Sequence, residues 1–273
     1  MTPLSPFTRK PFGDDPRSRL FVALDVASWP EAEEVLSRLG ESVRRVKVGL
    51  ELFFAEGPRI VETLAERGYE VFLDLKLHDI PNTVYRAARL LPAEGVLFLT
   101  VHASGGREMV RAAYEGIREA LVRSERSRTT GSPGLPGDVP PYLLGVTWLT
   151  SLSETEFARL GIERERSAGV LAGEALAGGA AGLVASAREV ASLRAALGPG
   201  PILVVPGIRP ADPAFSPRDD DQRRVSTPEE AIRAGADAVV VGRPIVRASD
   251  PRKAAEAILG EIAAARSDFP PVR

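Results

Sequence analysis

The sequence predicts an α/β fold with a single domain, a (β/α)8 or TIM barrel, and three observations lead to this prediction. The chain has 273 residues, 44% of them hydrophobic, which suffices for the one large core of such a barrel. Eight short β-rich runs alternate with helical patterns, as parallel strands and their crossover helices do. Most of these runs are continuously apolar, as expected for strands that are covered on both faces.

Expected strands and helices follow one another from residue 20 to the end of the chain. The expected strands are 20–25, 43–49, 70–76, 95–102, 142–150, 181–186, 201–207 and 236–242. The expected helices are 29–39, 58–67, 108–122, 166–177, 187–197, 228–234 and 252–265. Thr227, Pro228 and Glu230 form a good helix start, with Thr at the N-cap, Pro at the first position and Glu at the third. An open doubly wound sheet is the alternative, but no G-x-G-x-x-G fingerprint follows the first strand.

Three segments interrupt this regular pattern. Residues 1–19 are polar and contain prolines, so we expect an irregular N-terminal extension before a barrel domain of residues 20–273. Residues 124–141 are rich in Gly, Pro, Ser and Thr and read as a flexible insertion on the barrel face away from the chemistry. Residues 212–224 follow the seventh strand and therefore lie on the catalytic face, where they form either a lid or a solvated run of charge.

Composition narrows the function classes. The net charge of −2 gives no electrostatic footprint for nucleic acid or a membrane surface. The absence of cysteine excludes disulfides and thiolate metal sites. We find neither a signal peptide nor an apolar run of membrane-spanning length, so a soluble cytoplasmic protein is expected. We expect no second His or Cys near either His78 or His102, so no metal site is expected there and both histidines are expected to be hydrogen-bonded structural residues. Trp29 and Trp148 are expected to pack.

Charged side chains stand at the ends of three consecutive expected strands. Asp25 ends the first, Lys47 lies near the end of the second, and Asp74 and Lys76 end the third, with Asp79 just beyond. The carboxyl ends of barrel strands meet at one rim, where active sites of this fold lie. Only four of the 35 basic residues are lysine, and a lysine, unlike an arginine, can release its proton. The cluster therefore predicts a catalytic site, with rim-closing ion pairs as the alternative.

The spacing of Asp74 and Lys76 also predicts which way the third strand faces. Residues two apart on a strand point to the same side. If Asp74 and Lys76 point inward, Phe72 becomes a core residue, and Leu73 and Leu75 turn outward against helices. The opposite orientation would bury charges in the helix layer, where each would need a partner.

Two glycine–arginine turns predict a phosphate site. Gly207 and Arg209 follow the seventh expected strand, and Gly242 and Arg243 follow the eighth. The loops after these two strands commonly hold phosphate in TIM barrels. Glycine permits close backbone approach, and an arginine side chain donates a fork of hydrogen bonds to phosphate oxygens. The alternative for each motif is an ordinary turn glycine beside a solvated arginine.

One longer run is specific. Residues 74–83, Asp-Leu-Lys-Leu-His-Asp-Ile-Pro-Asn-Thr, closely resemble the signature of orotidine 5′-phosphate decarboxylases. The resemblance covers nearly the whole barrel, because shorter matches occur in the same order at 21–25, 46–49, 101–103, 149–151, 206–209, 221–222 and 241–245. It implies the conversion of orotidine 5′-phosphate to UMP and CO2 in pyrimidine biosynthesis, with no metal or organic cofactor.

The resemblance also implies roles for individual residues. Lys76 is the implied proton donor to C6 of the pyrimidine, and the other implied catalytic residues are Asp74, Lys47 and Asp79. The implied substrate-binding residues are Asp25, Lys47, Thr83, Thr150, Arg209, Gln222, Gly242 and Arg243. A homodimer is implied, in which Asp79 and Thr83 reach into the partner's site.

Two other functions stay open at this point. Decarboxylases and aldolases that act on sugar phosphates with Mg²⁺ share a similar D-x-K-x-x-D pattern, but the continuation His-Asp-Ile-Pro-Asn-Thr at 78–83 argues against them. A non-catalytic nucleotide-binding barrel is the second alternative, and the intact set of Asp and Lys residues argues against it.

Overall fold

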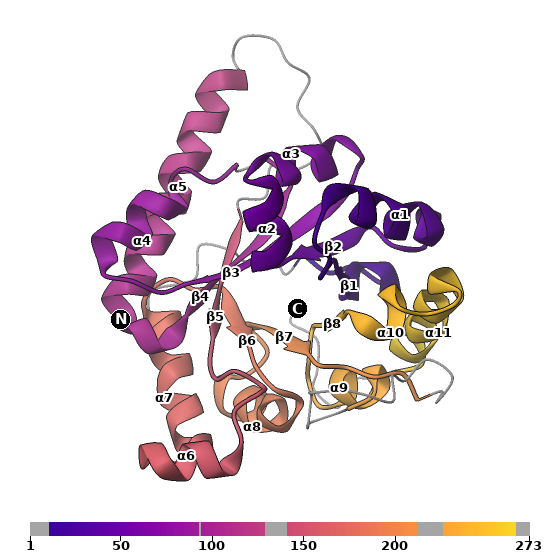
Figure 1. Cartoon of the computed structure of the whole chain (residues 1–273). Helices are drawn as coiled ribbons and strands as arrows, with labels where there is room; N and C mark the ends of the chain where they lie inside the picture. The colour runs from indigo at the N-terminus through magenta and orange to yellow at the C-terminus, as the bar shows by residue number, and fades with distance from the viewer. Residues whose placement is uncertain (1–10, 93, 129–140, 212–225, 266–273) are drawn as a thin grey trace.

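Eight parallel strands pair in chain order, and the first also pairs with the last, so the sheet closes into a barrel (Figure 1). The computed structural model describes residues 11–92, 94–128, 141–211 and 226–265. The strands are β1 (Leu20–Ala23), β2 (Arg45–Val48), β3 (Glu70–Leu77), β4 (Val96–His102), β5 (Tyr142–Val146), β6 (Gly182–Val184), β7 (Ile202–Pro206) and β8 (Ala238–Val241). The predicted (β/α)8 barrel is confirmed, and the open doubly wound sheet is ruled out.

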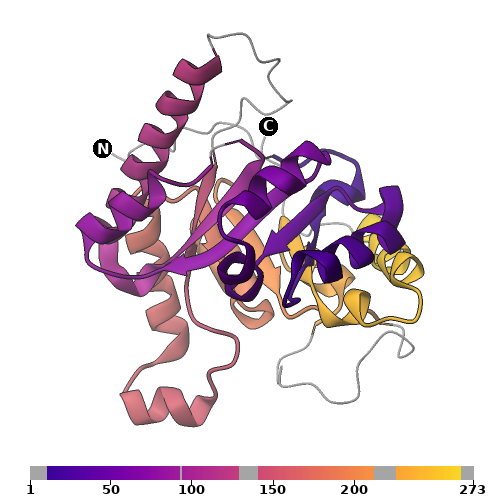
Figure 2. The same cartoon turned by 45° about the horizontal axis from the view of Figure 1, so that its top comes forward.

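Helices surround the barrel, and α5 reaches beyond it in both views (Figures 1 and 2). The α-helices are α1 (Trp29–Leu39), α2 (Leu50–Glu56), α3 (Arg59–Glu66), α4 (Pro81–Ala88), α5 (Gly106–Arg128), α6 (Glu154–Leu160), α7 (Arg164–Ala177), α8 (Ala187–Leu197), α9 (Pro228–Arg233), α10 (Arg243–Val246) and α11 (Pro251–Ala264). Single 3-10 turns are η1 (Pro16–Arg19), η2 (Gly40–Ser42) and η3 (Ala103–Gly105). The predicted capping box of Thr227 and Glu230 starts α9.

Four helices were missed by the sequence analysis: α2, α4, α6 and α10. Each has at most eight residues, which is too short for a clear 3.6-residue periodicity. The expected insertion at 124–141 and the expected lid at 212–224 lie largely outside the described residues, so their roles stay predictions.

Side chains alternate along the strands and build two apolar layers. Phe21, Phe72 and Phe98 lie inside the barrel, with ring centroids 5.3–5.5 Å apart. Leu73 and Leu75 belong to the layer between the strands and the helices. The predicted orientation of the third strand is therefore confirmed. The three rings fill the middle of the barrel and support the strand ends above them.

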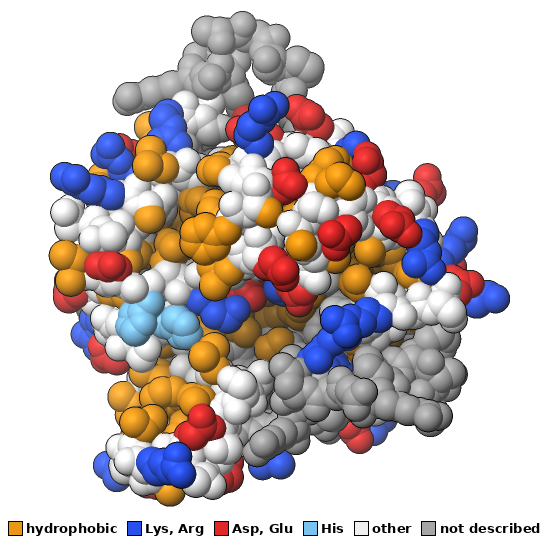
Figure 3. Space-filling model, in the orientation of Figure 1, with side chains coloured by type: hydrophobic (Ala, Val, Ile, Leu, Met, Phe, Trp, Pro, Cys, Tyr) orange, Lys and Arg blue, Asp and Glu red, His pale blue; other side chains and the backbone are white. Residues whose placement is uncertain are grey.

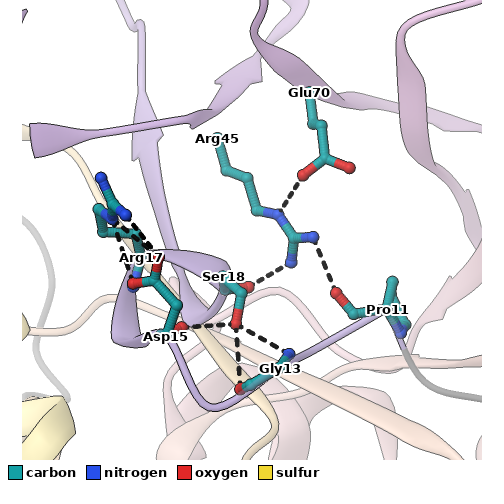
Figure 4. Close-up of polar contacts among 7 residues, drawn as sticks. All are labelled: Pro11, Gly13, Asp15, Arg17, Ser18, Arg45 and Glu70. Atoms are coloured by element: carbon teal, nitrogen blue, oxygen red, sulfur yellow. Dashed lines mark hydrogen bonds and ion pairs between the residues drawn. The ribbon is translucent and has the colours of Figure 1, made fainter. Parts of the chain in front are cut away.

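Arg45 closes the opposite end of the barrel, where the strands begin (Figure 4). It is the first residue of β2 and is only 6% exposed. Its Nη2 donates to the Pro11 carbonyl oxygen at 2.8 Å, its Nη1 donates to the carbonyl of Ser18, and its Nε pairs with Glu70 at 2.7 Å. One buried guanidinium therefore ties the segment before β1 to the starts of β2 and β3.

Phe12 completes this closure. Its ring centroid lies 6.2 Å from that of Phe98, and the Arg45 guanidinium carbon lies 5.5 Å from the Phe12 ring and 5.6 Å from the Phe21 ring. A guanidinium held between two rings gains cation–π attraction as well as hydrogen bonds. The described part of the expected N-terminal extension, residues 11–19, thus packs onto the barrel and includes the turn η1.

Arg45→Met should lower the free energy of unfolding by about 2 kcal/mol, because charge-assisted hydrogen bonds to two carbonyls are lost. Arg67→Met is the matched control, since Arg67 also pairs with a glutamate and lies over an aromatic ring but is 46% exposed. The control should lose less than about 1 kcal/mol, as exposed pairs do. Urea unfolding curves measure both, and equal losses would contradict a closing role for Arg45.

Candidate active site

A pocket of about 280 Å³ opens where the barrel strands end. Figure 3 shows it as a hollow near the middle of that face, bordered by basic and acidic side chains. The residues that line it are Ala23, Asp25, Lys47, Phe72, Asp74, Lys76, Val146, Trp148, Leu149, Thr150, Ser151, Val184, Ala185, Pro206, Gly207, Arg209, Val240, Gly242 and Arg243. Every strand except β4 contributes to this lining directly or through the segment that follows it.

Four charged side chains form one network at this mouth. Lys76 Nζ lies 2.6 Å from Asp74 Oδ2, and Lys47 Nζ lies 3.7 Å from the same oxygen. Lys47 Nζ also donates to Asp25 Oδ1 at 2.8 Å. Positive and negative groups therefore alternate across β1, β2 and β3. The structure brings together the four residues that the sequence analysis placed at the rim.

Asp74 is the most deeply buried carboxylate of this network, at 8% exposure. Its other oxygen, Oδ1, accepts a hydrogen bond from Thr100 Oγ1 at 2.9 Å. Burial by itself raises the pKa of Asp74, but Lys47, Lys76 and the hydrogen bonds from Lys76 and Thr100 outweigh burial and hold the pKa below its ordinary value. Asp74 is thus a carboxylate at neutral pH, and it holds the side chains of Lys47 and Lys76 in place.

Lys76 reaches this position through an unusual backbone. Its φ of 48° is left-handed, and among the described residues no other non-glycine residue has a positive φ. The pairing of β3 with β4 shifts register between Leu73 and Leu77, so β3 bulges around Lys76. Its amide donates to Thr100 Oγ1 at 2.9 Å, which fixes the bulge. Such strain costs about 1–3 kcal/mol and is typical of functional sites.

Thr100 was missed by the sequence analysis although it supports both Asp74 and the Lys76 amide. It is fully buried on β4. A hydroxyl within an otherwise apolar strand was the available signal, since a buried polar group needs a hydrogen-bond partner.

The arginines predicted to bind phosphate lie on the other side of the same pocket. Arg209 is 7% exposed and donates to the Ile208 carbonyl at 2.9 Å. Gly207 has a φ of 76°, which a side chain would strain. A Cβ on Gly242 would lie 3.3 Å from that of Ala23, so glycine allows this close approach. Arg243 also lines the pocket, whereas Gln222 lies outside the described residues.

Trp148, expected only to pack, also lines the pocket. Its ring meets that of Phe157 edge to face at 5.4 Å, so the packing itself is confirmed. Thr150, a predicted substrate contact, lies in the same wall, together with Leu149 and Ser151. This wall offers apolar surface and two hydroxyl groups.

Asp79 and Thr83 do not line the pocket of their own chain. Both are exposed, and Asp79 accepts a hydrogen bond from the Ile80 amide at 2.6 Å. The single chain therefore leaves their predicted roles as predictions.

The two histidines lie together, contrary to the expectation that neither has a second histidine near it. Their ring centroids are 5.3 Å apart, and Figure 3 shows them side by side next to the hollow. His78 follows β3 and His102 ends β4, so the pairing of these strands brings them together. Burial, His78 and Lys76 lower the pKa of His102.

Neither a metal cluster nor a membrane helix is found in the described part of the chain. No group of three or more His, Cys, Asp or Glu side chains there is arranged to hold a metal ion. No described helix combines the length and apolar character needed to cross a membrane.

Comparison with known proteins gives consistent matches. The model of the "Orotidine 5′-phosphate decarboxylase / HUMPS family" matches residues 18–258. An orotidine 5′-phosphate decarboxylase of Anaeromyxobacter dehalogenans is 49% identical over 245 residues, covering 89% of this chain and 97% of the relative. That of Syntrophotalea carbinolica is 46% identical over 251 residues, covering 91% and 96%.

Solved structures agree with these matches. The crystal structure of orotidine 5′-phosphate decarboxylase from Lactobacillus acidophilus superposes with a TM-score of 0.74 at 39% identity, covering 90% of this chain and 99% of that one. An uncharacterized conserved protein from Geobacillus kaustophilus superposes with a TM-score of 0.71 at 35% identity, covering 89% and 99%.

Asp74 should make the stability of the protein depend on pH. Because its pKa in the folded chain lies below the ordinary value of 3.8, its contribution is complete above that value and is lost as the pH falls through the lowered pKa. Asp74→Asn should flatten the fall in unfolding free energy below about pH 4. Asp14→Asn, at an exposed carboxylate in the segment before β1, is the control. Urea unfolding at successive pH values measures this, and parallel profiles for wild type and Asp74→Asn would contradict the expectation.

Proposed function

This chain belongs to the orotidine 5′-phosphate decarboxylase / HUMPS family, and we propose that its pocket converts orotidine 5′-phosphate to UMP and CO2. The enzyme is then a carboxy-lyase of pyrimidine biosynthesis, and its expected location is the cytoplasm. The observation that carries the proposal is the buried Asp74 carboxylate held between Lys47 and Lys76 at the barrel mouth. An ammonium held in position beside the substrate suits a reaction in which negative charge develops on carbon.

Lys76 acts as the proton donor in this proposal. When the bond between C6 and the carboxylate breaks, CO2 leaves and the electron pair stays on C6. The Lys76 ammonium stabilises that charge and then transfers a proton to C6, which gives UMP. Asp74 holds Lys76 at 2.6 Å, so the ammonium is in place before the charge develops. A group that needs no rearrangement during the reaction gives the largest electrostatic benefit.

The other residues that the resemblance implies for substrate binding contact different parts of the substrate in this proposal. Lys47 and Asp25 contact the ribose, and Thr150 contacts the pyrimidine. Arg209, Gly242, Arg243 and Gln222 bind the phosphate. Binding energy at the phosphate can lower the barrier at the ring, because contacts far from the reacting bond help to hold it in the reactive geometry.

The proposed enzyme is a homodimer. Asp79 and Thr83 lie outside the pocket of their own chain and are exposed on the segment that follows β3. Ile80, between them, exposes 66% of its surface, which is a high fraction for a large apolar residue. A partner subunit covering this segment would bury Ile80 and bring Asp79 and Thr83 to the partner's pocket.

A sugar-phosphate lyase that uses Mg²⁺ is the competing function within the same broad type of barrel. Such an enzyme needs carboxylates that are free to bind the metal. Here the Lys47 ammonium lies 2.8 Å from Asp25 and 3.7 Å from Asp74, so it occupies the space between the two carboxylates. The arrangement favours decarboxylation without a cofactor over metal-dependent chemistry.

Lys76→Arg is the sharpest test of the proposed mechanism. Arginine keeps the positive charge but does not give up a proton at neutral pH, so kcat/KM for orotidine 5′-phosphate should fall by about 10²–10⁴-fold, nearly as far as for Lys76→Ala. The loss of orotidine 5′-phosphate is followed by absorbance with EDTA present, and UMP binding shows that each variant is folded.

Two results would oppose this proposal. A folded Lys76→Arg enzyme within about tenfold of wild type would mean that the proton comes from another group. Wild-type activity that is lost with EDTA and restored by Mg²⁺ would favour the sugar-phosphate alternative, and UMP binding without turnover would indicate a non-catalytic barrel.

Subunit complementation tests the homodimer. Asp79→Ala and Lys76→Ala chains should each be nearly inactive alone, but a mixture should regain activity after subunit exchange. One site of the mixed dimer then carries both substitutions and the other carries neither. If tagged chains are shown to exchange and no activity returns, Asp79 serves its own subunit.

A further inference from the structure

We propose that Arg164, which lies outside the pocket, is a positioning residue that fixes the pocket wall of residues 148–151 against the barrel. The inference rests on the proposed function, because it assigns a role to the wall that contacts the pyrimidine. It follows from a chain of contacts that runs from the pocket to Glu189 on α8.

The wall stands on a long excursion of the chain. Residues 147–163 connect β5 to α7, and the short helix α6 lies within them. In the closed ring of eight strands β5 stands opposite β1, so the wall faces the charged network across the mouth. A turn in which the Leu152 amide donates to the Leu149 carbonyl at 3.1 Å links the wall to α6. The wall therefore runs directly into α6 through this turn.

Trp148 contacts both α6 and α7. Its ring meets Phe157 of α6 at 5.4 Å with an interplanar angle of 89°, and Phe157 is 2% exposed. Its indole Nε1 donates to Ser167 Oγ on α7 at 3.1 Å. Trp148 is thus both a pocket-lining residue and the point at which α6 and α7 meet the wall.

Arg164 contacts both α6 and the Ser167 hydroxyl that binds Trp148. It is the first residue of α7 and is 8% exposed. Its Nη1 donates to Glu154 Oε1 at the start of α6 at 2.8 Å, and its Cζ lies 5.1 Å from the centroid of the Phe157 ring. Its carbonyl accepts from Ser167 Oγ at 2.9 Å, the same hydroxyl that accepts from Trp148. The side chain of Arg164 therefore fixes the α6 end of the support under the wall, and its backbone carbonyl holds the Ser167 hydroxyl at the α7 end.

Glu189 connects Arg164 to the barrel itself. It lies on α8, which begins directly after β6, and is 3% exposed. Its Oε2 accepts from the amide and hydroxyl of Ser186 at 2.9 and 2.6 Å. Its Oε1 lies 3.6 Å from Arg164 Nε, and neither atom has a hydrogen-bond partner among the described residues. Because α8 packs against β7, Glu189 is held in place relative to the barrel.

The incomplete contact between Arg164 and Glu189 speaks for positioning rather than for stability. Buried polar atoms without hydrogen bonds cost free energy, and buried ion pairs are weak sources of stability. What such a pair does provide is a single preferred arrangement of the two elements that carry it. Here those elements are the base of the pocket wall and the barrel, so the arrangement serves the site.

Arg164→Met tests this, and Arg194→Met is its matched control. Arg194 is also a buried arginine in an ion pair, 2.7 Å from Asp237, but it donates to the carbonyls of Gly198, Pro201 and Gly235 at the opposite end of the barrel. Both substitutions remove a buried ion pair and should lower stability. Only Arg164→Met should disturb the pocket.

Two readouts separate positioning from stability. At a temperature where all variants are folded, kcat/KM for orotidine 5′-phosphate should fall by about 10–100-fold in Arg164→Met and stay unchanged in Arg194→Met. With Trp29→Phe as background, Trp148 is the only tryptophan, and its fluorescence change on adding UMP should shrink in Arg164→Met alone. Arg164→Lys, which can reach Glu154 or Glu189 but not both, should fall between wild type and Arg164→Met.

The outcomes distinguish this inference from the proposed function. If wild type turns over orotidine 5′-phosphate and Arg164→Met matches Arg194→Met in both readouts, Arg164 is merely structural and the inference is wrong. If wild type does not turn over orotidine 5′-phosphate, the proposed function fails, while the Trp148 signal with UMP still tests the positioning role. Should Arg164→Met not fold, Arg164→Lys carries the same comparison.

Discussion

The need to pair the buried Asp74 carboxylate determines the arrangement of the whole barrel mouth. A charge at that depth is tolerated only with opposite charges and hydrogen bonds around it. Lys76 on its own strand, Lys47 on β2 and Thr100 on β4 supply them. Lys47 in turn holds Asp25. The two carboxylates and two ammonium groups cancel, so the arginines on the other side leave the pocket net positive, which suits a substrate carrying a carboxylate and a phosphate.

The barrel below makes this network rigid. Arg45 and Lys47 point to the same inner face of β2, one at the bottom of the barrel and one at its mouth. Between them the aromatic rings of Phe21, Phe72 and Phe98 fill the interior. Because protein interiors pack at the density of organic crystals, such a layer is hardly compressible and holds the strands around it in place. A single strand thus carries one cation that closes the base and another that builds the site.

The fold and the charged network followed from the sequence because both depend on local pattern. Apolar runs identified the strands. The two-residue spacing of Phe72, Asp74 and Lys76 identified which face of β3 points into the barrel. Contacts between elements were harder to foresee. The approach of His78 and His102 could have been deduced from strand order alone, since they end neighbouring strands. The support that Arg164 gives to Trp148 could not, because it depends on the path of a connection without periodic pattern.

The left-handed backbone of Lys76 sets stability and turnover against each other at one position. Glycine there would relieve the backbone strain, but it would also remove the proposed proton donor and one of the two ammonium groups that balance the buried Asp74 carboxylate. A screen for heat resistance would therefore report the balance of these two effects and not turnover, so laboratory evolution of this enzyme needs a selection for activity.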